Sequence, residues 1–310
     1  MSKKNNLVRN LILLAFLAIL LAACQPKPSN SAIDETPLLV TVSILPQAYF
    51  VERIGGERVS VNVMVGPGED PHTYEPKPEQ MRALSNSQLF FTIGTEYEAA
   101  WLPRLRDVNP EMSFIDSAAG IQRIPLADPH HHDDDDHPED ETDHADENGL
   151  DPHVWLAPAN GKVIASNILT ALTAHAPEYA ESFQTNYTAL TADIDALDAR
   201  IGSLLAGVEG RAFMVFHPAW GYFADQYNLE QIPVEVGGQE PSASDMAALI
   251  ATAREENIRV IFIQPSFSTA NAQAIAQEIN AEVAVVDPLA RDWLENLVLV
   301  AEAFSSALGQ

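Results

Sequence analysis

Cysteine is almost absent from this sequence of 310 residues, in which Cys24 is the only one. A chain with one cysteine cannot be held together by an internal disulfide, and it cannot build a cysteine-rich metal site. Long apolar runs are equally scarce, because beyond the N-terminal segment none is long enough to cross a membrane. The length is sufficient for two domains of ordinary size.

Basic residues are also few, with 17 Lys and Arg against 44 Asp and Glu and a formal net charge of -27. A strongly negative chain repels phosphate groups, so we expect no nucleic acid partner. The acidity favours a cation as partner only weakly, because many proteins are acidic.

The N-terminus has the form of a secretory signal. Lys3, Lys4 and Arg9 precede the apolar run LILLAFLAILLAA, and Cys24 follows it. A positive region, a short apolar core and small residues before the cut describe such a signal. An uncleaved membrane anchor with an incidental cysteine is the alternative. In either case we expect the rest of the chain to lie outside the cytoplasm, with the polar segment 25–36 as a tether.

The stretch Pro177–Ala206 has a single apolar stripe. Its members follow one another at steps of four and three residues: Phe183, Tyr187, Leu190, Ile194, Leu197, Ile201 and Leu204. This period predicts one amphipathic helix of about thirty residues. A coiled-coil strand or a bundle helix is the plainer interpretation. We favour a rigid rod that joins two α/β lobes, because both flanking regions alternate between strand and helix patterns.

Four short strand patterns precede the long helix and four follow it. We expect strands at 38–44, 58–65, 88–93 and 113–116, and then at 211–216, 232–236, 259–263 and 282–286. Helices are predicted at 46–54, 78–86, 99–107 and 157–174, and then at 219–227, 243–256, 269–280 and 292–308. This alternation predicts an α/β fold whose two lobes contain mostly parallel sheets. In such sheets ligands bind at the carboxyl ends of the strands.

The segment Asp128–Glu147 is acidic and rich in histidine. It holds eleven carboxylates and five of the nine histidines: His130, His131, His132, His137 and His144. It has almost nothing apolar to bury, so we expect it to be disordered. Imidazole and carboxylate are ligands of zinc and similar metals. We favour weak, multiple metal capture over a solvated acidic linker, because three of the histidines are consecutive.

Four further residues form a candidate metal site: His72, His153, His217 and Asp287. Each is expected in a loop, and two come from each side of the long helix. Three imidazoles and one carboxylate satisfy a four-coordinate divalent ion. They are far apart in sequence, so on the residues alone the cluster is a conjecture. His175 ends a predicted helix and suits its negative end instead.

The motifs around these residues resemble the metal-binding lipoproteins of bacterial ABC transporters for zinc and manganese, the high-affinity zinc-uptake type in particular. The resemblance is carried by GPGEDPHTYEPKP, DPHVWLAP, VFHPAWGYFADQY, GQEPSASDMAALI and VVDPLA, together with the long helix and the histidine-rich insert. Leu21-Ala22-Ala23-Cys24 resembles the lipobox of bacterial lipoproteins, which implies lipidation of Cys24. The resemblance implies two α/β lobes joined by one long helix, with the metal between them.

In function, the resemblance implies an extracytoplasmic, lipid-anchored monomer that captures Zn²⁺ and delivers it to a membrane permease with its ATPase. It also implies metal-ligand roles for His72, His153, His217 and Asp287. Manganese members use two histidines and two carboxylates, whereas His217 here makes the set richer in nitrogen and favours zinc over Mn²⁺. Some zinc members have a carboxylate directly before the first histidine. Here Pro71 occupies that position, and the carboxylates Glu69 and Asp70 precede it in the sequence.

Two other functions compete with this interpretation. A zinc metallohydrolase needs an open coordination position for water and a general base. Four protein ligands leave no such position, and nothing in the sequence places Glu240 beside the metal as a base, so we expect no enzyme. A surface adhesin or metal buffer without transport is the second alternative.

The expected organisation is a signal (1–24), a tether (25–36), a first lobe (37–176), a linking helix (177–206) and a second lobe (207–310).

Overall fold

The computed structural model describes residues 36–127, 149–236, 238–265 and 270–309. Pro37–Gln310 form one compact unit. The predicted signal with Cys24, most of the tether and the histidine-rich insert therefore lie outside the described residues. Among the residues described, the helices are all too short or too polar to span a membrane. The boundaries that divide Pro37–Gln310 into lobes and a linking helix stay predictions.

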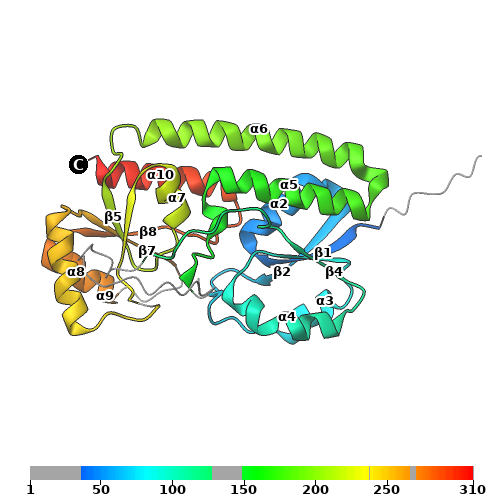
Figure 1. Cartoon of the computed structure of the whole chain (residues 1–310), viewed down its shortest axis with the longest axis horizontal. Coiled ribbons are helices and arrows are strands. Elements are labelled where there is room, and N and C mark those ends of the chain that lie inside the picture. The colour runs from blue at the N-terminus through cyan, green and yellow to red at the C-terminus, as the bar shows by residue number, and fades with distance from the viewer. Residues whose placement is uncertain (1–35, 128–148, 237, 266–269, 310) are drawn as a thin grey trace, which may run out of the picture. The chain divides into compact units, whose positions relative to one another are not determined.

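Two four-stranded parallel sheets form the framework of the compact unit, and they share one strand order (Figure 1). The first has the order β2-β1-β3-β4 and the second the order β6-β5-β7-β8. The strands are β1 (Leu38–Ile44), β2 (Val59–Val65), β3 (Leu89–Thr92), β4 (Ser113–Asp116), β5 (Ala212–Val215), β6 (Glu230–Pro233), β7 (Val260–Ile263) and β8 (Glu282–Val285). The predicted α/β fold with parallel sheets is confirmed.

Helices follow the strands in each half, and the last helix of each half comes after the final strand of its sheet. They are α2 (Leu45–Gly55), α3 (Pro78–Leu84), α4 (Glu96–Val108) and α5 (Pro158–His175) in the first half, and α7 (Gly221–Gln226), α8 (Ala243–Glu255), α9 (Ala270–Ile279) and α10 (Trp293–Leu308) in the second. The largest difference among the strands concerns β6, which covers Glu230–Pro233 instead of the expected 232–236. Residues after Pro233 are buried although they form a loop. The alternating apolar pattern of Ile232 and Val234 therefore extends beyond the end of the strand, and the predicted strand was too long at that end.

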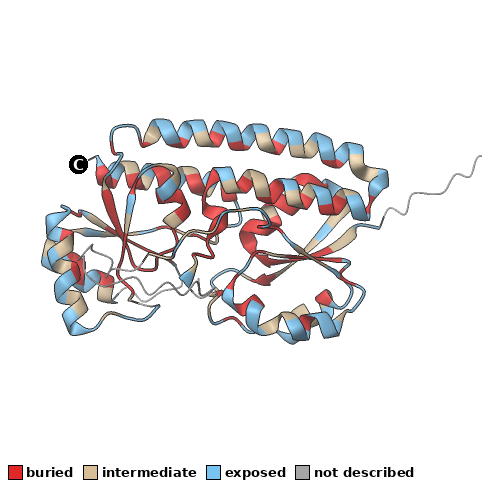
Figure 2. Cartoon of the chain, viewed as in Figure 1, coloured by how far each residue is buried: buried red, intermediate tan, exposed pale blue. Residues whose placement is uncertain are grey.

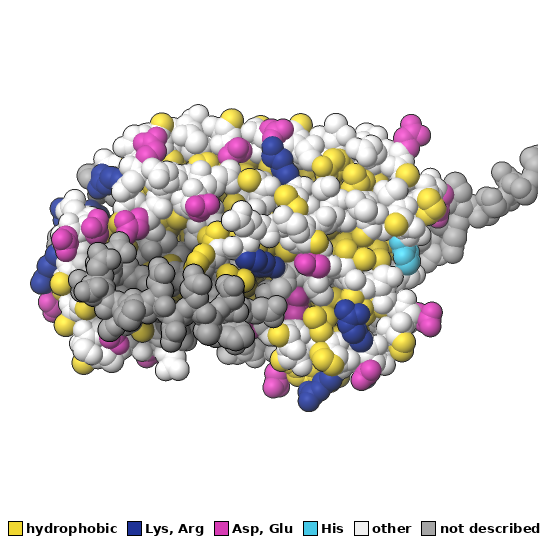
Figure 3. All heavy atoms as spheres, viewed as in Figure 1, with side chains coloured by type: hydrophobic (Ala, Val, Ile, Leu, Met, Phe, Trp, Pro, Cys, Tyr) yellow, Lys and Arg dark blue, Asp and Glu magenta, His cyan; other side chains and the backbone are white. Residues whose placement is uncertain are grey.

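The long helix is confirmed. A 3-10 turn at Pro177–Tyr179 leads into α6 (Ala180–Leu204), whose stripe buries Phe183, Leu190, Ile194, Leu197 and Ile201. Its other face is exposed (Figure 2). Acidic side chains lie along its outer edge (Figure 3). The buried face packs on α2 and α5 of the first half and on α10 of the second, so α6 contacts helices from both halves.

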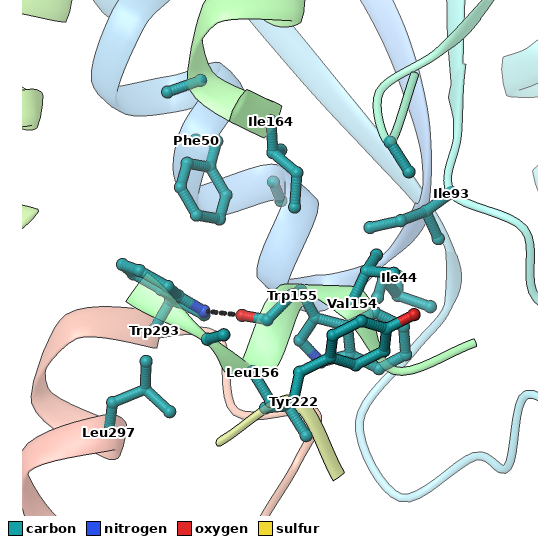
Figure 4. Packing of buried hydrophobic residues seen from close by; sticks show 14 of the residues in the cluster. Ile44, Phe50, Ile93, Val154, Trp155, Leu156, Ile164, Tyr222, Trp293 and Leu297 are labelled. Atoms are coloured by element: carbon teal, nitrogen blue, oxygen red, sulfur yellow. Dashed lines mark hydrogen bonds between the residues drawn. The ribbon is translucent and has the colours of Figure 1, made fainter. Parts of the chain in front are cut away.

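Two tryptophans, Trp155 and Trp293, connect the two halves (Figure 4). Trp293 Nε1, at the start of α10, donates to the carbonyl oxygen of Trp155 at 2.6 Å, and Trp155 Nε1 donates to that of Pro288 at 2.7 Å. The Trp293 ring lies 4.8 Å from that of Phe50. Gly161 is required here, because a Cβ atom would lie 2.6 Å from the Trp293 ring. One hydrophobic core therefore spans both halves, and a smaller one lies between the second sheet and α8 and α9.

Candidate metal centre

Three histidines from separate loops converge at the carboxyl ends of the strands. His72 follows β2, His217 lies two residues after β5, and His153 precedes the 3-10 turn Val154–Leu156. One ring nitrogen from each lies within 4.8 Å of the other two. This is the edge at which parallel sheets bind ligands. The structure thus brings together three of the four predicted metal ligands.

The spacing of the three rings suits a single ion. His72 Nε2 lies 3.0 Å from His217 Nε2, and His217 Nε2 lies 3.3 Å from His153 Nε2. Tetrahedral zinc with nitrogen ligands at about 2.0–2.1 Å places its ligand atoms roughly 3.3 Å apart. Two of the three nitrogen–nitrogen distances are therefore already close to the separation that a four-coordinate ion requires, and the third is within 4.8 Å.

Each imidazole also contacts a carboxylate through its other nitrogen. The Nδ1 atom of His72 lies 3.1 Å from Glu96, that of His153 lies 2.8 Å from Asp151, and that of His217 lies 2.7 Å from Glu235. A carboxylate only accepts, so each Nδ1 carries a proton, and the neutral form of each ring has its lone pair on Nε2. Carboxylates in this position orient metal-binding imidazoles and raise their basicity.

Burial differs among the three. His153 and His217 are buried, whereas the His72 side chain is 27% exposed and its partner Glu96 is 50% exposed. Burial lowers the pKa of His217, although the hydrogen bond that the ring donates to Glu235 acts to raise it. For His72, burial acts to lower the pKa, but the hydrogen bond and charge of Glu96 outweigh it and raise the pKa. At Glu96, burial acts to raise the pKa, but the hydrogen bond and charge of His72 outweigh it. The pKa of the Glu96 carboxyl is therefore lowered to about 2. The His72–Glu96 pair forms the open side of the site.

The same three-residue pattern, Asp-Pro-His, sets two of the loops. Asp70 Oδ1 accepts the backbone N–H of His72 at 3.0 Å, and Asp151 Oδ1 accepts that of His153 at 2.8 Å. Such side-chain hydrogen bonds two residues along the chain are Asx turns. They fix the backbone of each histidine. Asp70, one of the two carboxylates that precede Pro71, thereby orients the His72 loop.

The β3–α4 turn beside His72 is held by a buried polar network. The Glu98 carboxylate accepts the backbone N–H groups of Ile93 and Gly94 and the hydroxyl of Ser43. Gln47 accepts from Ser43 N and donates to the carbonyl oxygens of Phe91 and Thr92. Glu96 begins α4 directly after this turn, so the network fixes the carboxylate that contacts His72.

Asp287 is not in the three-histidine group. It lies after β8 in a cavity of about 240 Å³, which is also lined by Glu69, Gln264 and Arg291. Its Oδ1 accepts the backbone N–H of Leu289 at 2.8 Å, and burial raises its pKa. Its role as a fourth ligand stays a prediction. The predicted auxiliary ligands lie outside the described residues: His130, His131, His132, His137 and His144.

Sequence reasoning did not single out the three carboxylates that orient the imidazoles. Asp151 was within reach, because it begins the DPH motif and repeats the spacing of Asp70 to His72. Glu96 and Glu235 carried no such signal. Glu96 begins a helix whose predicted start lay three residues later, and Glu235 stood on a predicted strand. Both reach the site only because strands far apart in sequence end at one place.

The fold and the site define a class of protein: two parallel α/β sheets with a convergent set of imidazoles suited to a divalent metal. Residues 40–307 match the family described as zinc-uptake complex component A, periplasmic (ZnuA). The chain belongs to this family. The high-affinity zinc uptake system protein ZnuA of Bacillus subtilis is 28% identical over 285 residues, which cover 90% of this chain and 88% of that protein. The zinc-binding lipoprotein AdcA of Streptococcus pneumoniae (strain TIGR4) is 26% identical, but this chain spans only 55% of its length.

Solved structures agree with this membership. A crystal structure of ZnuA is 41% identical with a TM-score of 0.80, covering 88% of this chain and all of that chain (100%). A zinc-bound deletion mutant of ZnuA is 42% identical with a TM-score of 0.78, covering 88% and 98%. The family and these relatives are metal-uptake and metal-binding proteins, which confirms the prediction that the chain is not an enzyme.

Proposed function

We propose that this protein captures Zn²⁺ outside the cytoplasm through His72, His153 and His217 and delivers it to the permease of an ABC transporter with its ATPase. The observation that carries the proposal is the convergence of three Nε2 atoms whose imidazoles each contact a carboxylate through Nδ1. Neutral imidazoles aimed at one point bind a divalent cation, and the carboxylates supply opposite charge beside it.

Zinc is favoured over Mn²⁺ by the donor atoms. The converging atoms are three nitrogens, and the nearest carboxylates contact the imidazoles instead of facing the same point. Imidazole suits zinc, whereas manganese prefers carboxylate, carbonyl and water oxygen. The names of the Bacillus subtilis and pneumococcal relatives also refer to zinc.

Three imidazoles leave a fourth coordination position. Asp287 would fill it by a short movement of the β8–α10 loop, or water would occupy it. The ion would enter past the partly exposed pair His72 and Glu96. Since Trp155 and Trp293 tie the halves together, we expect loop shifts rather than closure of one half on the other.

The remaining parts of the proposal concern residues that the structure does not describe. Cys24 would carry the lipid that anchors a monomer to a bacterial membrane. The five histidines of the insert would raise the local zinc concentration. Deleting residues 128–147 should then lower the total zinc bound and leave one tight site, whereas loss of the tight site would contradict this division of labour.

The test uses the metal-free chain from residue 25 onward, titrated with zinc and with manganese by calorimetry, alongside His217→Asp. We expect one tight zinc site with weaker ones behind it, and a marked loss of the tight site in the variant. Tight manganese binding that survives competition by zinc would move the protein to the manganese branch of the family. The absence of any tight site would refute the proposal.

A further inference from the structure

Asp151 is a buried carboxylate with only one satisfied oxygen. Its Oδ1 accepts the backbone N–H of His153 and lies 2.8 Å from His153 Nδ1. Its Oδ2 has no hydrogen-bond partner among the described residues, and the residue is 0% exposed. A buried charge that is only partly paired is costly, and such a group in a native protein calls for an explanation.

The unsatisfied oxygen faces the second half of the chain. A Cβ atom on Gly221 would lie 2.4 Å from Asp151 Oδ2 and 3.6 Å from its Cγ. The next residue, Tyr222, donates its hydroxyl to the carbonyl oxygen of Asp151 at 3.0 Å and accepts the backbone N–H of Ile124 at 3.3 Å. The first turn of α7 therefore covers the carboxylate and leaves no room for a water on that side.

We propose that Asp151 is a positioning residue whose buried, half-paired charge, covered by Gly221, lowers the stability of the metal-free protein and raises the affinity for a divalent cation. The inference rests on the proposed function, because the compensating charge is the ion bound by His153. Asp151 has Oδ1 on Nδ1 of that imidazole, so a cation on Nε2 offsets the charge across one ring. Unsatisfied polar groups of this kind collect at functional sites, where stability is lost in favour of binding.

The first test compares Asp151→Asn with the natural chain, both from residue 25 onward. Asparagine keeps the acceptor for His153 and removes the charge. We expect zinc affinity, measured by competition with a chelator, to fall about 10- to 100-fold. The thermal midpoint of the metal-free variant should equal or exceed that of the natural chain. A role confined to structure would lower the metal-free midpoint, so a lower midpoint, or an affinity within about twofold of the natural chain, would overturn the inference.

The second test asks whether Gly221 and Asp151 are in contact. Gly221→Ala should lower both the midpoint and the zinc affinity, because its methyl group collides with Oδ2. In the background of Asp151→Ala the same methyl group finds space, so its effect on the midpoint should largely disappear. Gly202→Ala on α6 is the matched control, because a Cβ there meets nothing within 4 Å. Equal effects of Gly221→Ala in both backgrounds would contradict the proposed contact.

His153→Ala separates this inference from the proposed function. If His153→Ala removes tight zinc binding and Asp151→Asn does not change it, the metal site stands and the role of Asp151 fails. If His153→Ala leaves zinc affinity unchanged, the proposed site itself is wrong.

Discussion

The two sheets share one strand order, yet their carboxyl ends differ in how polar groups are paired. In the first sheet, the buried side chain of Gln47 accepts from Ser43 and Ile44 and donates to the carbonyl oxygen of Phe91 in β3 and to the hydroxyl of Ser117 after β4. In the second sheet, Gln264 follows β7 and is also buried, but its Nε2 has no partner among the described residues. The glutamine at the carboxyl end of the first sheet is therefore paired on both its oxygen and its nitrogen, whereas the glutamine at that end of the second sheet keeps an unpaired amide nitrogen.

This difference suggests a division of roles. The first half holds His72 and His153 on Asx turns, and the network of Gln47 and Glu98 supports the turn that carries Glu96. The second half supplies His217 on Glu235, and it places Asp287 and Gln264 around a cavity. An unpaired buried amide costs free energy, so its loop has less to lose by rearranging. We expect metal-linked movement in the loops of the second half.

The largest expected effect is on the histidine from the second half. His217→Ala removes a proposed nitrogen ligand and leaves Glu235 buried without its partner, so zinc affinity should fall more than 100-fold, beyond the range of changes to orienting residues. His72→Ala, at the open side, should weaken binding less. Competition with a chelator measures the zinc affinity of both variants. A larger loss of affinity for His72→Ala than for His217→Ala would contradict this prediction.

The next effect tests whether the two halves share one core. Trp293→Ala removes an indole from between Phe50 and Gly161 and should lower the free energy of unfolding by about 3 to 5 kcal/mol. Leu299→Ala on the same helix is the control, because Leu299 is 56% exposed. It should change stability by less than about 0.5 kcal/mol. Denaturant unfolding measures both, and two separate transitions in the natural protein would argue against a shared core.

A matched pair of glutamines tests the contrast between the sheets directly. Gln47→Met leaves the buried N–H groups of Ser43 and Ile44 without an acceptor, at about 1 to 3 kcal/mol each, so stability should fall by about 2 to 6 kcal/mol. Gln264→Met removes an amide whose Nε2 is already unpaired and should be nearly neutral or stabilising. Equal losses in denaturant unfolding would show that the second sheet is as well paired as the first.

The smallest effect is the dependence on pH. The pKa of His72 is raised above its usual 6.5, so protons compete with zinc as the pH falls through that value, and affinity should fall by about tenfold per pH unit for one displaced proton. The linkage to metal-free stability has the opposite sign. Stability from protonated His72 is complete below pH 6.5 and is lost as the pH rises through the folded-state pKa.

Titrations of the natural protein and Glu96→Gln measure this effect. Without the Glu96 charge, the loss of affinity should begin at a lower pH. An unchanged profile would indicate that Glu96 does not set the protonation of His72.

Much of the fold could be predicted because it depends on local patterns. The stripe of α6 and the strand patterns alternating with helices specify an α/β protein with a long helix. The three histidines could be singled out only because their motifs resemble a known family, since their convergence depends on strands far apart in the chain. Glu96 and Glu235 could not be found, because a carboxylate that orients an imidazole leaves no spacing signal. The separation of Asp287 from the histidines could not be foreseen either, because it depends on how one loop follows β8.

The most direct test of the central claim is a crystal structure of the zinc-bound chain from residue 25 onward, with the metal located by its anomalous scattering. We predict one fully occupied zinc ion bound by the Nε2 atoms of His72, His153 and His217, with Glu96, Asp151 and Glu235 still on their Nδ1 atoms. A zinc ion bound elsewhere, with these three imidazoles left without metal, would contradict the account.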